Sequence, residues 1–196
     1  MKLTLDTNCV IDLEENRPEA LPLRELVQMS SEGILQFAVV GISASENKPG
    51  GGGSPTFSAF QEKVVRVGLA SAEILKPMGI WGVTYWDWCV YADDGMEGLA
   101  EDIHRILFPR SEYGYADYCA ARGLSVDGEE IDRTWRNRMC DVLALWCHIH
   151  YRRDIFVTRD GNFLASTKRR LLESMGGRVI CSPTDAISTV RQRLAN

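Results

Sequence analysis

Short apolar runs alternate with longer stretches of helical periodicity along this chain of 196 residues. Four of the runs are expected to form strands, namely Lys2–Leu5, Ile34–Ile42, Asp154–Thr158 and Arg178–Cys181. Helical spacing is clearest over Phe57–Leu69, Glu97–Phe108, Arg133–Tyr151, Phe163–Met175 and a last helix capped by Ser182 or Thr184. Such an order of strands and helices predicts an α/β fold around a mostly parallel sheet.

The stretch from about residue 74 to residue 132 departs from this alternation. It contains Trp81, Trp86 and Trp88 and most of the acidic excess of the chain. We interpret residues 1–196 as one domain with an insertion at about 74–132, and the Gly-rich stretch 48–55 as a surface loop. The tryptophans are expected to form an accessory hydrophobic core, because aromatic side chains mostly serve burial. A specificity or oligomerisation element is the alternative.

Composition and patterning exclude several classes of protein. The 45% hydrophobic and 25% charged residues are typical of a globular domain. The longest apolar stretch, Ile34–Ile42, is too short to cross a bilayer, and the first residues lack the pattern of a secretory signal, so a cytoplasmic protein without membrane contact is expected. Cys140, Cys147, His148 and His150 lie close in sequence, but a helix places the histidines about 200° apart, which favours core thiols over a zinc site.

Charge is divided unevenly along the chain. The net charge is −5, yet Arg133–Asn196 carries 12 Lys and Arg against 5 Asp and Glu, whereas residues 1–132 carry 10 against 22. This division indicates either a basic surface that binds a polyanion beside an acidic cluster, or a solvated basic helix face. The choice between them depends on whether the chain contains a site.

Four acidic residues occupy comparable places in the predicted fold. Asp6 ends the first strand, Glu46 follows the second by a few residues, and Asp160 follows the third. Asp141 lies in the long helix before that third strand, with Asn137 one turn earlier on the same face. Each acid alone is also an ordinary cap, turn or surface residue. Because ligands of parallel α/β sheets bind outside the carboxyl ends of the strands, the four carboxylates are expected to converge.

Converging carboxylates repel one another and raise one another's pKa unless a cation neutralises them. Mg²⁺ and Mn²⁺ are suited to this role because they prefer oxygen ligands. Such ions polarise phosphodiesters and activate water, singly or as a pair about 3.5–4 Å apart. The sequence therefore predicts metal-dependent phosphodiester hydrolysis without a Ser, Cys or His nucleophile.

The sequence around these acids resembles the PIN-domain family. Leu3–Leu13 is similar to the opening motif of that family, and Asn137–Leu145 followed by Ile155–Phe163 is similar to its closing half. The resemblance implies a three-layer α/β/α sandwich and an Mg²⁺- or Mn²⁺-dependent ribonuclease related to the toxin-type VapC ribonucleases. Toxin-type members are silenced by an antitoxin. An antitoxin-like partner and a homodimer stay open here, because the stretch between Glu46 and Asn137 is longer than in compact members.

The resemblance also assigns roles by position. The metal-binding and catalytic acids are matched by Asp6, Glu46, Asp141 and Asp160. Polar residues that typically support those acids are matched by Asn8, Asn137 and Thr158. Residue 162 is Asn where many members place a further acid, so a second metal is expected to be weak or absent.

Basic residues are expected to guide the substrate, which the resemblance implies is single-stranded RNA, through phosphate contacts. The candidates are Arg133, Arg136, Arg138, Arg152, Arg153, Arg159, Lys168, Arg169 and Arg170. The main alternative function is a catalytically weak or inactive PIN-like module that acts as a scaffold or partner-binding protein. An aspartyl-nucleophile phosphatase is disfavoured because Asn8 replaces the second Asp it needs, and a serine hydrolase because the stretch 41–45 lacks the final Gly of a nucleophile elbow.

Overall fold

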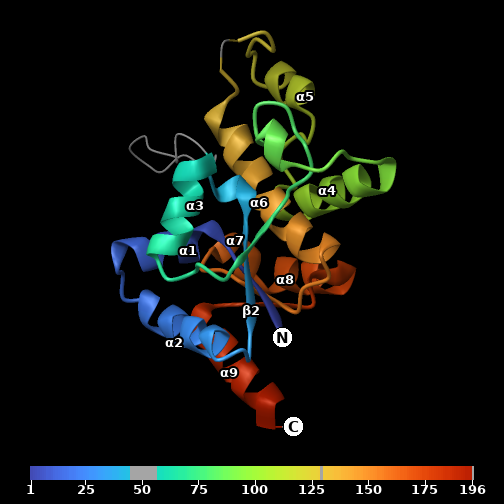
Figure 1. Cartoon of the computed structure of the whole chain (residues 1–196). Helices are drawn as coiled ribbons and strands as arrows, with labels where there is room; N and C mark the ends of the chain where they lie inside the picture. Colours follow the sequence, from blue (N-terminus) through green and yellow to red (C-terminus); the bar gives the residue numbers. More distant parts are fainter. Residues whose placement is uncertain (45–56, 129, 196) are drawn as a thin grey trace.

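The computed structural model of the chain describes residues 1–44, 57–128 and 130–195. It contains a five-stranded sheet of order β3-β2-β1-β4-β5 in which every neighbouring pair is parallel (Figure 1). The strands are β1 (Lys2–Leu5), β2 (Gln36–Val40), β3 (Glu73–Leu75), β4 (Ile155–Val157) and β5 (Val179–Cys181). The predicted α/β fold with a mostly parallel sheet is confirmed. The edge strand β3 is an element that the sequence analysis did not predict.

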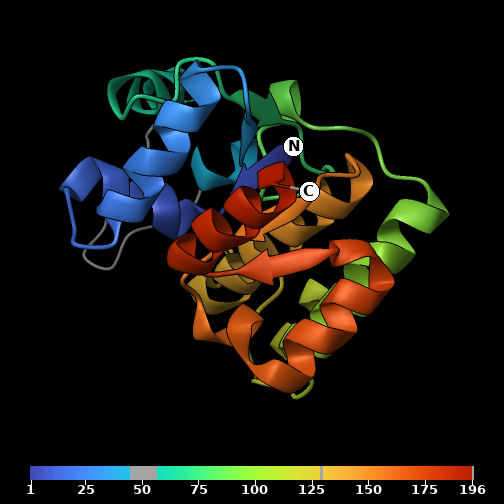
Figure 2. The ribbon, with the colours of Figure 1, turned by 90° about the horizontal axis from the view of Figure 1, so that it is seen from below.

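Helices cover both faces of the sheet (Figures 1 and 2). One face packs against α1 (Thr7–Glu15), α2 (Ala20–Ser31), α3 (Phe57–Arg66) and α9 (Pro183–Ala195). The other face packs against α4 (Asp94–Leu107), α5 (Tyr115–Ala120), α6 (Arg133–His150), α7 (Gly161–Leu164) and α8 (Ser166–Leu172). Each strand therefore lies between two hydrophobic cores.

The continuous apolar run around β2 follows from this double burial. Phe37 and Val39 point into the core beside α1 and α2, whereas Ala38 and Val40 point into the core beside α6. Strands of a parallel sheet covered on both faces need apolar residues at every position, so the polar alternation of a half-exposed strand is lost. The expected buried strand at Ile34–Ile42 is confirmed over Gln36–Val40.

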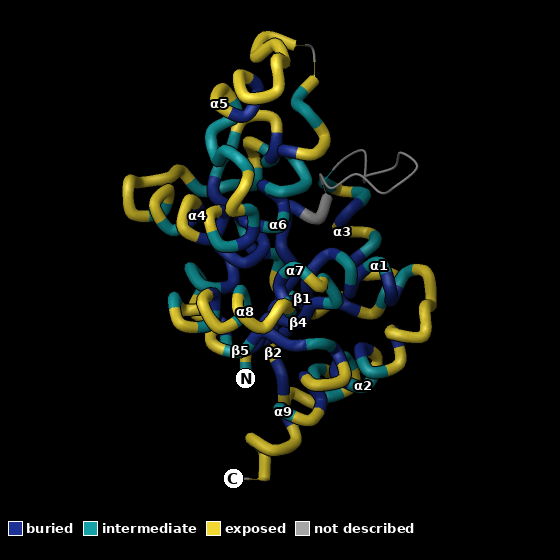
Figure 3. Tube along the Cα trace, turned by 180° about the vertical axis from the view of Figure 1, so that it is seen from behind, coloured by how far each residue is buried: buried dark blue, intermediate teal, exposed yellow. Residues whose placement is uncertain are grey.

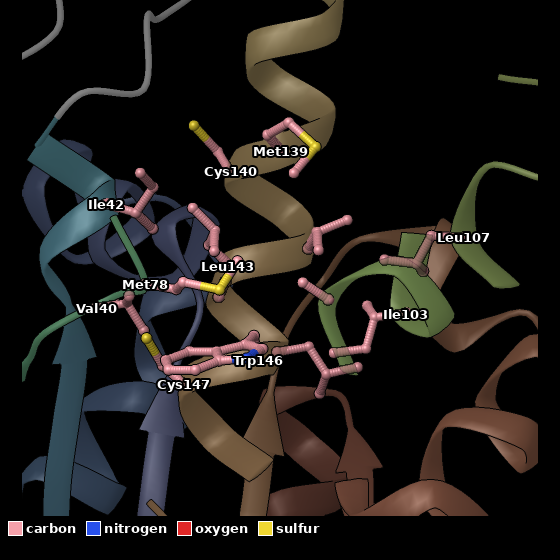
Figure 4. Packing of buried hydrophobic residues seen from close by; sticks show 14 of the residues in the cluster. Val40, Ile42, Met78, Ile103, Leu107, Met139, Cys140, Leu143, Trp146 and Cys147 are labelled. Atoms are coloured by element: carbon pink, nitrogen blue, oxygen red, sulfur yellow. The ribbon is translucent and has the colours of Figure 1, made fainter. Parts of the chain in front are cut away.

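Helix α6 forms the centre of the second core. Cys140, Leu143, Trp146 and Cys147 on this helix pack with Val40 and its neighbours (Figure 4), and the Trp146 indole N–H donates to the carbonyl of Met96 at 3.0 Å. The two cysteines are buried free thiols, as predicted.

The buried His148 connects α6 to the first strand. Its Nδ1 lies 3.0 Å from Thr4 Oγ1 and its Nε2 lies 3.1 Å from the carbonyl oxygen of Gly177. Both ring nitrogens thus join parts of the fold that are far apart in sequence, and the imidazole serves the packing between them.

Three expected features of the C-terminal part can be compared with the structure. The single helix expected over Phe163–Met175 is wrong: the chain forms α7, then α8, then a π-type turn over Glu173–Gly177. Gly176 adopts a φ of 121°, which only glycine tolerates easily, and ends the helical stretch as the sequence predicted. Ser182 caps α9, since its Oγ accepts a hydrogen bond from the backbone N–H of Asp185 at 3.2 Å.

The segment between β3 and α6 extends beyond the carboxyl ends of the strands and carries α4 and α5 (Figure 1). The prediction that its tryptophans form an accessory core is wrong for two of them, because Trp81 is 74% and Trp86 is 57% exposed. Trp88 is partly covered, and its ring stacks on Phe57 with centroids 4.6 Å apart. The core of this segment is built from aliphatic and sulfur side chains such as Met78 and Val83.

Burial follows the layers of the fold. The strands and the inner face of α6 are buried, whereas the outer turns of α4, α5 and α8 are exposed (Figure 3). None of the helices in residues 1–44, 57–128 and 130–195 is long and apolar enough to cross a membrane. The predicted loop at 48–55 lies outside the described residues.

Candidate functional site

Asp6 lies at the carboxyl end of β1, where the strand passes directly into α1. Its extended backbone (φ −69°, ψ 158°) makes it the N-cap residue of the helix, and Oδ1 accepts a hydrogen bond from the N–H of Thr7 at 2.8 Å. Oδ2 accepts from the Asn8 side-chain amide and from the Thr158 hydroxyl, both at 2.6 Å. The carboxylate is only 5% exposed. Its orientation is therefore set by several donors.

Asn8 and Thr158 join the end of β1 to the loop after β4. The Thr158 hydroxyl, besides donating to Asp6, accepts from the Asn8 amide at 3.1 Å and from the backbone N–H of Asp160 at 3.0 Å. Asn8 Oδ1 accepts the backbone N–H of Arg159 at 3.0 Å. Asn8 and Thr158 therefore connect Asp6 to the backbone of Arg159 and Asp160.

Asp160 and Asp141 reach the same place from other elements. Asp160 caps α7, with Oδ1 accepting the N–H of Asn162 at 2.7 Å. Asp141 projects from the middle of α6. Together with Asp6 they line a pocket of about 250 Å³ at the carboxyl edge of the sheet, completed by Asn8, Ile11 and Arg159. Three of the four acids that the sequence singled out are therefore brought together, and the fourth, Glu46, lies outside the described residues.

The two remaining supporting residues differ in their surroundings. Asn137 lies one helical turn before Asp141, and its Oδ1 is shielded from solvent without a hydrogen-bond partner in the part of the chain that the structure describes. Asn162 Oδ1 accepts a short hydrogen bond from the ammonium of Lys168, which also donates to the carbonyl of Leu107 at 2.6 Å. Lys168 thus joins α8 to α4.

A buried ion pair that the sequence analysis missed lies behind the pocket. Asp12, one turn after Asn8 on α1, is 0% exposed, and both its oxygens accept hydrogen bonds from the Arg159 guanidinium. Arg17 approaches the same carboxylate at 3.5 Å. This hydrogen bonding raises the pKa of Arg159 further. The i, i+4 spacing of Asn8 and Asp12 was the available signal, because it places Asp12 on the face of α1 that carries Asn8.

The predicted substrate-binding residues are distributed over several surfaces. Arg159 borders the pocket through the guanidinium that Asp12 binds. Arg138 donates to Ser111 Oγ at 2.7 Å and lies over the ring of Phe108, on the side of α6 that faces α4. Arg136 borders a different cavity, near the start of α6. Arg169 is partly buried on α8.

The expectation that Arg153 contacts substrate is wrong. This residue is 2% exposed, and its guanidinium donates to the carbonyls of Leu3 and Gln36 and to the Glu73 carboxylate, at 2.8–3.0 Å. It therefore joins β1, β2 and β3 inside the fold.

The nearest thiol does not offer a nucleophile. Burial, followed by the charges of Asp6 and Asp12, raises the pKa of the Cys9 thiol well above its usual value. Cys9 Sγ contacts Asn8 Oδ1 at 3.3 Å and the carbonyl of Val157 at 3.4 Å. A protonated, hydrogen-bonded thiol of this kind is a packing group.

The donor set of the pocket fits Mg²⁺ or Mn²⁺. Within residues 1–44, 57–128 and 130–195, no three His, Cys, Asp or Glu side chains are close enough to hold an ion by themselves. Mg²⁺ does not need such a cage, because it keeps several waters and commonly binds through one or two carboxylates plus substrate phosphate. Carboxylates from three elements line the pocket and provide oxygen ligands and acceptors for such waters.

Comparison with known proteins adds one structural similarity. No protein-family profile and no curated protein matches this chain in sequence. Among solved structures, the chain is similar to one in the crystal structure of VapBC2 from Rickettsia felis bound to a DNA fragment from their promoter. The TM-score is 0.42, with 14% sequence identity over 93% of this chain and 98% of that chain.

Proposed function

We propose that this protein hydrolyses phosphodiester bonds in single-stranded RNA with the help of Mg²⁺ or Mn²⁺. The observation that carries the proposal is that Asp6, Asp141 and Asp160, from three separate elements, line one pocket at the carboxyl edge of the parallel sheet. Ligands of open α/β sheets bind at this edge. The resemblance to PIN-domain motifs supports both the chemistry and the choice of RNA.

The three aspartates would hold the cation. When bound, the ion polarises the phosphodiester and offsets the negative charge that develops on its oxygens. Thr158 and Asn8 keep the Asp6 carboxylate in one orientation through the bonds at 2.6 Å. Such supporting hydrogen bonds matter because the position of a metal ligand depends on the partners that hold it.

Water is the nucleophile that suits this pocket. Among the described residues the lining contains no histidine, and the thiol of Cys9, next to Asn8, is kept protonated by its raised pKa. The buried His148 is engaged with Thr4 and Gly177 on the other face of β1. A covalent intermediate on the protein is therefore not needed, and the carboxylates act by binding and orientation.

The test is cleavage of a labelled, unstructured RNA with and without Mn²⁺, using Asp6→Asn, Asp141→Asn and Asp160→Asn. Each variant is expected to lose about 100-fold or more in rate, because loss of a carboxylate removes both charge and a ligand. Asp102→Asn is the matched control. It is an exposed aspartate of α4 that does not line the pocket, so its rate should stay at the wild-type value.

Thermal unfolding in Mn²⁺ separates metal binding from catalysis. An ion that binds only the folded protein stabilises it by about 2.7 kcal/mol at 100 times its dissociation constant. This gain should disappear in Asp6→Asn. Cleavage that persists in both Asp6→Asn and Asp141→Asn would refute the proposal. A Mn²⁺-dependent rise in Tm without any cleavage would favour the alternative, a PIN-like binding module.

Partners follow from the same resemblance. The partner to test first is an antitoxin-like protein that blocks the pocket. A small protein encoded beside this chain is added to the cleavage assay, where it is expected to abolish the Mn²⁺-dependent cleavage.

A further inference from the structure

Two exposed tryptophans lie together at the start of α6. The rings of Trp81 and Trp86 are in contact, with centroids 5.6 Å apart and planes at 51°, although both side chains are mostly exposed. Exposed indoles forgo the burial energy that large aromatic side chains usually contribute. A contiguous pair of this kind indicates a surface that another molecule covers.

The loop that carries Trp81 is held in one conformation by its own hydrogen bonds. The backbone N–H of Ile80 donates to Thr84 Oγ1 at 2.9 Å, and the Thr84 hydroxyl donates back to the Ile80 carbonyl at 3.1 Å. Gly82 adopts a φ of 69°, and Ile131 packs so closely on it that a Cβ would lie 2.4 Å from Ile131 Cδ1. The exposure of Trp81 is therefore built into the fold, which limits the entropy lost on binding.

The pair borders a cavity of about 520 Å³ that also contains charge. Arg133 and Arg136 of α6 line it together with Glu130, so among the described residues of the lining two cationic groups accompany one carboxylate. The Arg136 Nε is shielded from solvent without a hydrogen-bond partner among the described residues. Aromatic rings beside arginines are the combination that binds single-stranded nucleic acid, where bases stack and phosphates pair with guanidinium groups.

The cavity and the carboxylate pocket both border helix α6. Arg133, Arg136, Asn137 and Asp141 occupy positions i, i+3, i+4 and i+8 of α6, which place them on one stripe. With a rise of about 1.5 Å per residue, Arg133 and Asp141 are separated by about 12 Å along the helix axis. A strand bound at the tryptophans could therefore follow this stripe to the site of hydrolysis.

We infer that the Trp81–Trp86 pair, with Arg133 and Arg136, is a binding site for unpaired nucleotides that leads an RNA strand along α6 to the aspartate pocket. The inference rests on the proposed function for the nature of the strand. It assigns the insertion between β3 and α6 a role in substrate binding.

The experiment measures binding in EDTA, where no cleavage takes place, using fluorescence anisotropy of a labelled oligouridine RNA. Trp81→Ala and Trp86→Ala are each expected to weaken binding about tenfold, the effect of removing one base stack. Trp81→Phe should restore most of the loss at that position. Tyr91→Ala is the matched control, since Tyr91 is an exposed aromatic residue of the same segment outside the cavity, and its affinity should equal that of the wild type.

Two further variants test the charges. Arg136→Ala should reduce the slope of log affinity against log salt by about 0.7, as expected for one lost phosphate contact on a single strand. Glu130→Gln should strengthen RNA binding because it removes the carboxylate of the cavity. A basic protein partner would respond in the opposite direction.

The inference is overturned if Trp81→Ala/Trp86→Ala binds RNA as tightly as the wild type in EDTA. It is also overturned if a duplex of the same length binds equally well, or if the double variant changes only the oligomeric state in light scattering. Because binding is measured without metal, these outcomes are independent of the cleavage results for Asp6→Asn. Loss of cleavage with intact binding in Asp6→Asn would support both proposals, whereas normal cleavage in both Asp6→Asn and Asp141→Asn would refute only the proposed function.

Discussion

Two buried aspartates of the first helix, Asp6 and Asp12, have opposite surroundings. Asp12 is fully buried and bound by the arginine fork of Arg159, with Arg17 nearby, so its charge is balanced inside the protein. Asp6 accepts hydrogen bonds from neutral groups of Thr7, Asn8 and Thr158 and lines a pocket with two further carboxylates.

The difference shows how burial alone fails to identify a functional acid. A carboxylate neutralised by a bidentate arginine contributes to the structure and is expensive to disturb. A carboxylate oriented by neutral donors beside other acids is favoured in its ionised form by a bound cation. The same residue type therefore serves folding at one position and, in our proposal, chemistry at the other.

The sharpest test of this contrast is the same substitution at both positions. Asp12→Asn should lower the free energy of unfolding by about 3 kcal/mol, because it leaves the Arg159 guanidinium without its charged partner. Asp6→Asn should change it by less than about 1 kcal/mol, since asparagine is also a good N-cap residue. Urea unfolding at pH 7 measures both values. Equal destabilisation by the two substitutions would contradict the different roles of Asp6 and Asp12.

Acid should destabilise the fold through protonation of His148. Burial lowers the pKa of His148 from its ordinary value of 6.5 to about 4, and the hydrogen bond to the Gly177 carbonyl offsets a part of this decrease. The folded-state pKa is depressed, so the stability is present above pH 6.5 and is lost as the pH falls. Between pH 8 and pH 5 the loss is expected to be about 2 kcal/mol, measured by urea unfolding.

Burial also lowers the pKa of His104, which adds a loss of the same sign. His148→Gln should therefore remove most, but not all, of the difference in unfolding free energy between pH 8 and pH 5. If that variant does not fold, the imidazole resonances of the wild type provide the test. Titration of His148 near pH 6.5 in the folded protein would contradict the expectation.

The smallest expected effect belongs to Arg159→Lys. Lysine keeps the charge but loses the two-pronged contact with Asp12, so a loss of about 1 kcal/mol in unfolding free energy is expected. RNA affinity should change little, because the guanidinium is already bound by Asp12. If Arg159→Lys instead weakens RNA binding about tenfold without loss of stability, the result would support the substrate contact that was predicted for Arg159 from the sequence.

Much of the candidate site was predictable because its signals are local. An acid at the end of an apolar run, as at Asp6 and Asp160, becomes a helix cap at the carboxyl edge of a parallel strand. Asp141 in an apolar helical stretch indicates a carboxylate that needs a partner. The split of the predicted helix 163–175 and the short edge strand β3 were missed, since three or four residues carry too little periodicity to be distinguished from their surroundings.

Local sequence specifies the alternation of strands and helices, the caps and the side of α6 on which Asn137 and Asp141 lie, because these depend on neighbours within a few residues. The ion pair of Arg159 with Asp12, the burial of Arg153 between strands and the exposure of Trp81 and Trp86 arise from the packing of distant segments. Burial and ion pairing depend on which distant segments meet. A helix or strand pattern defines the direction of a side chain within its element, but it does not define which group of another segment the side chain will contact.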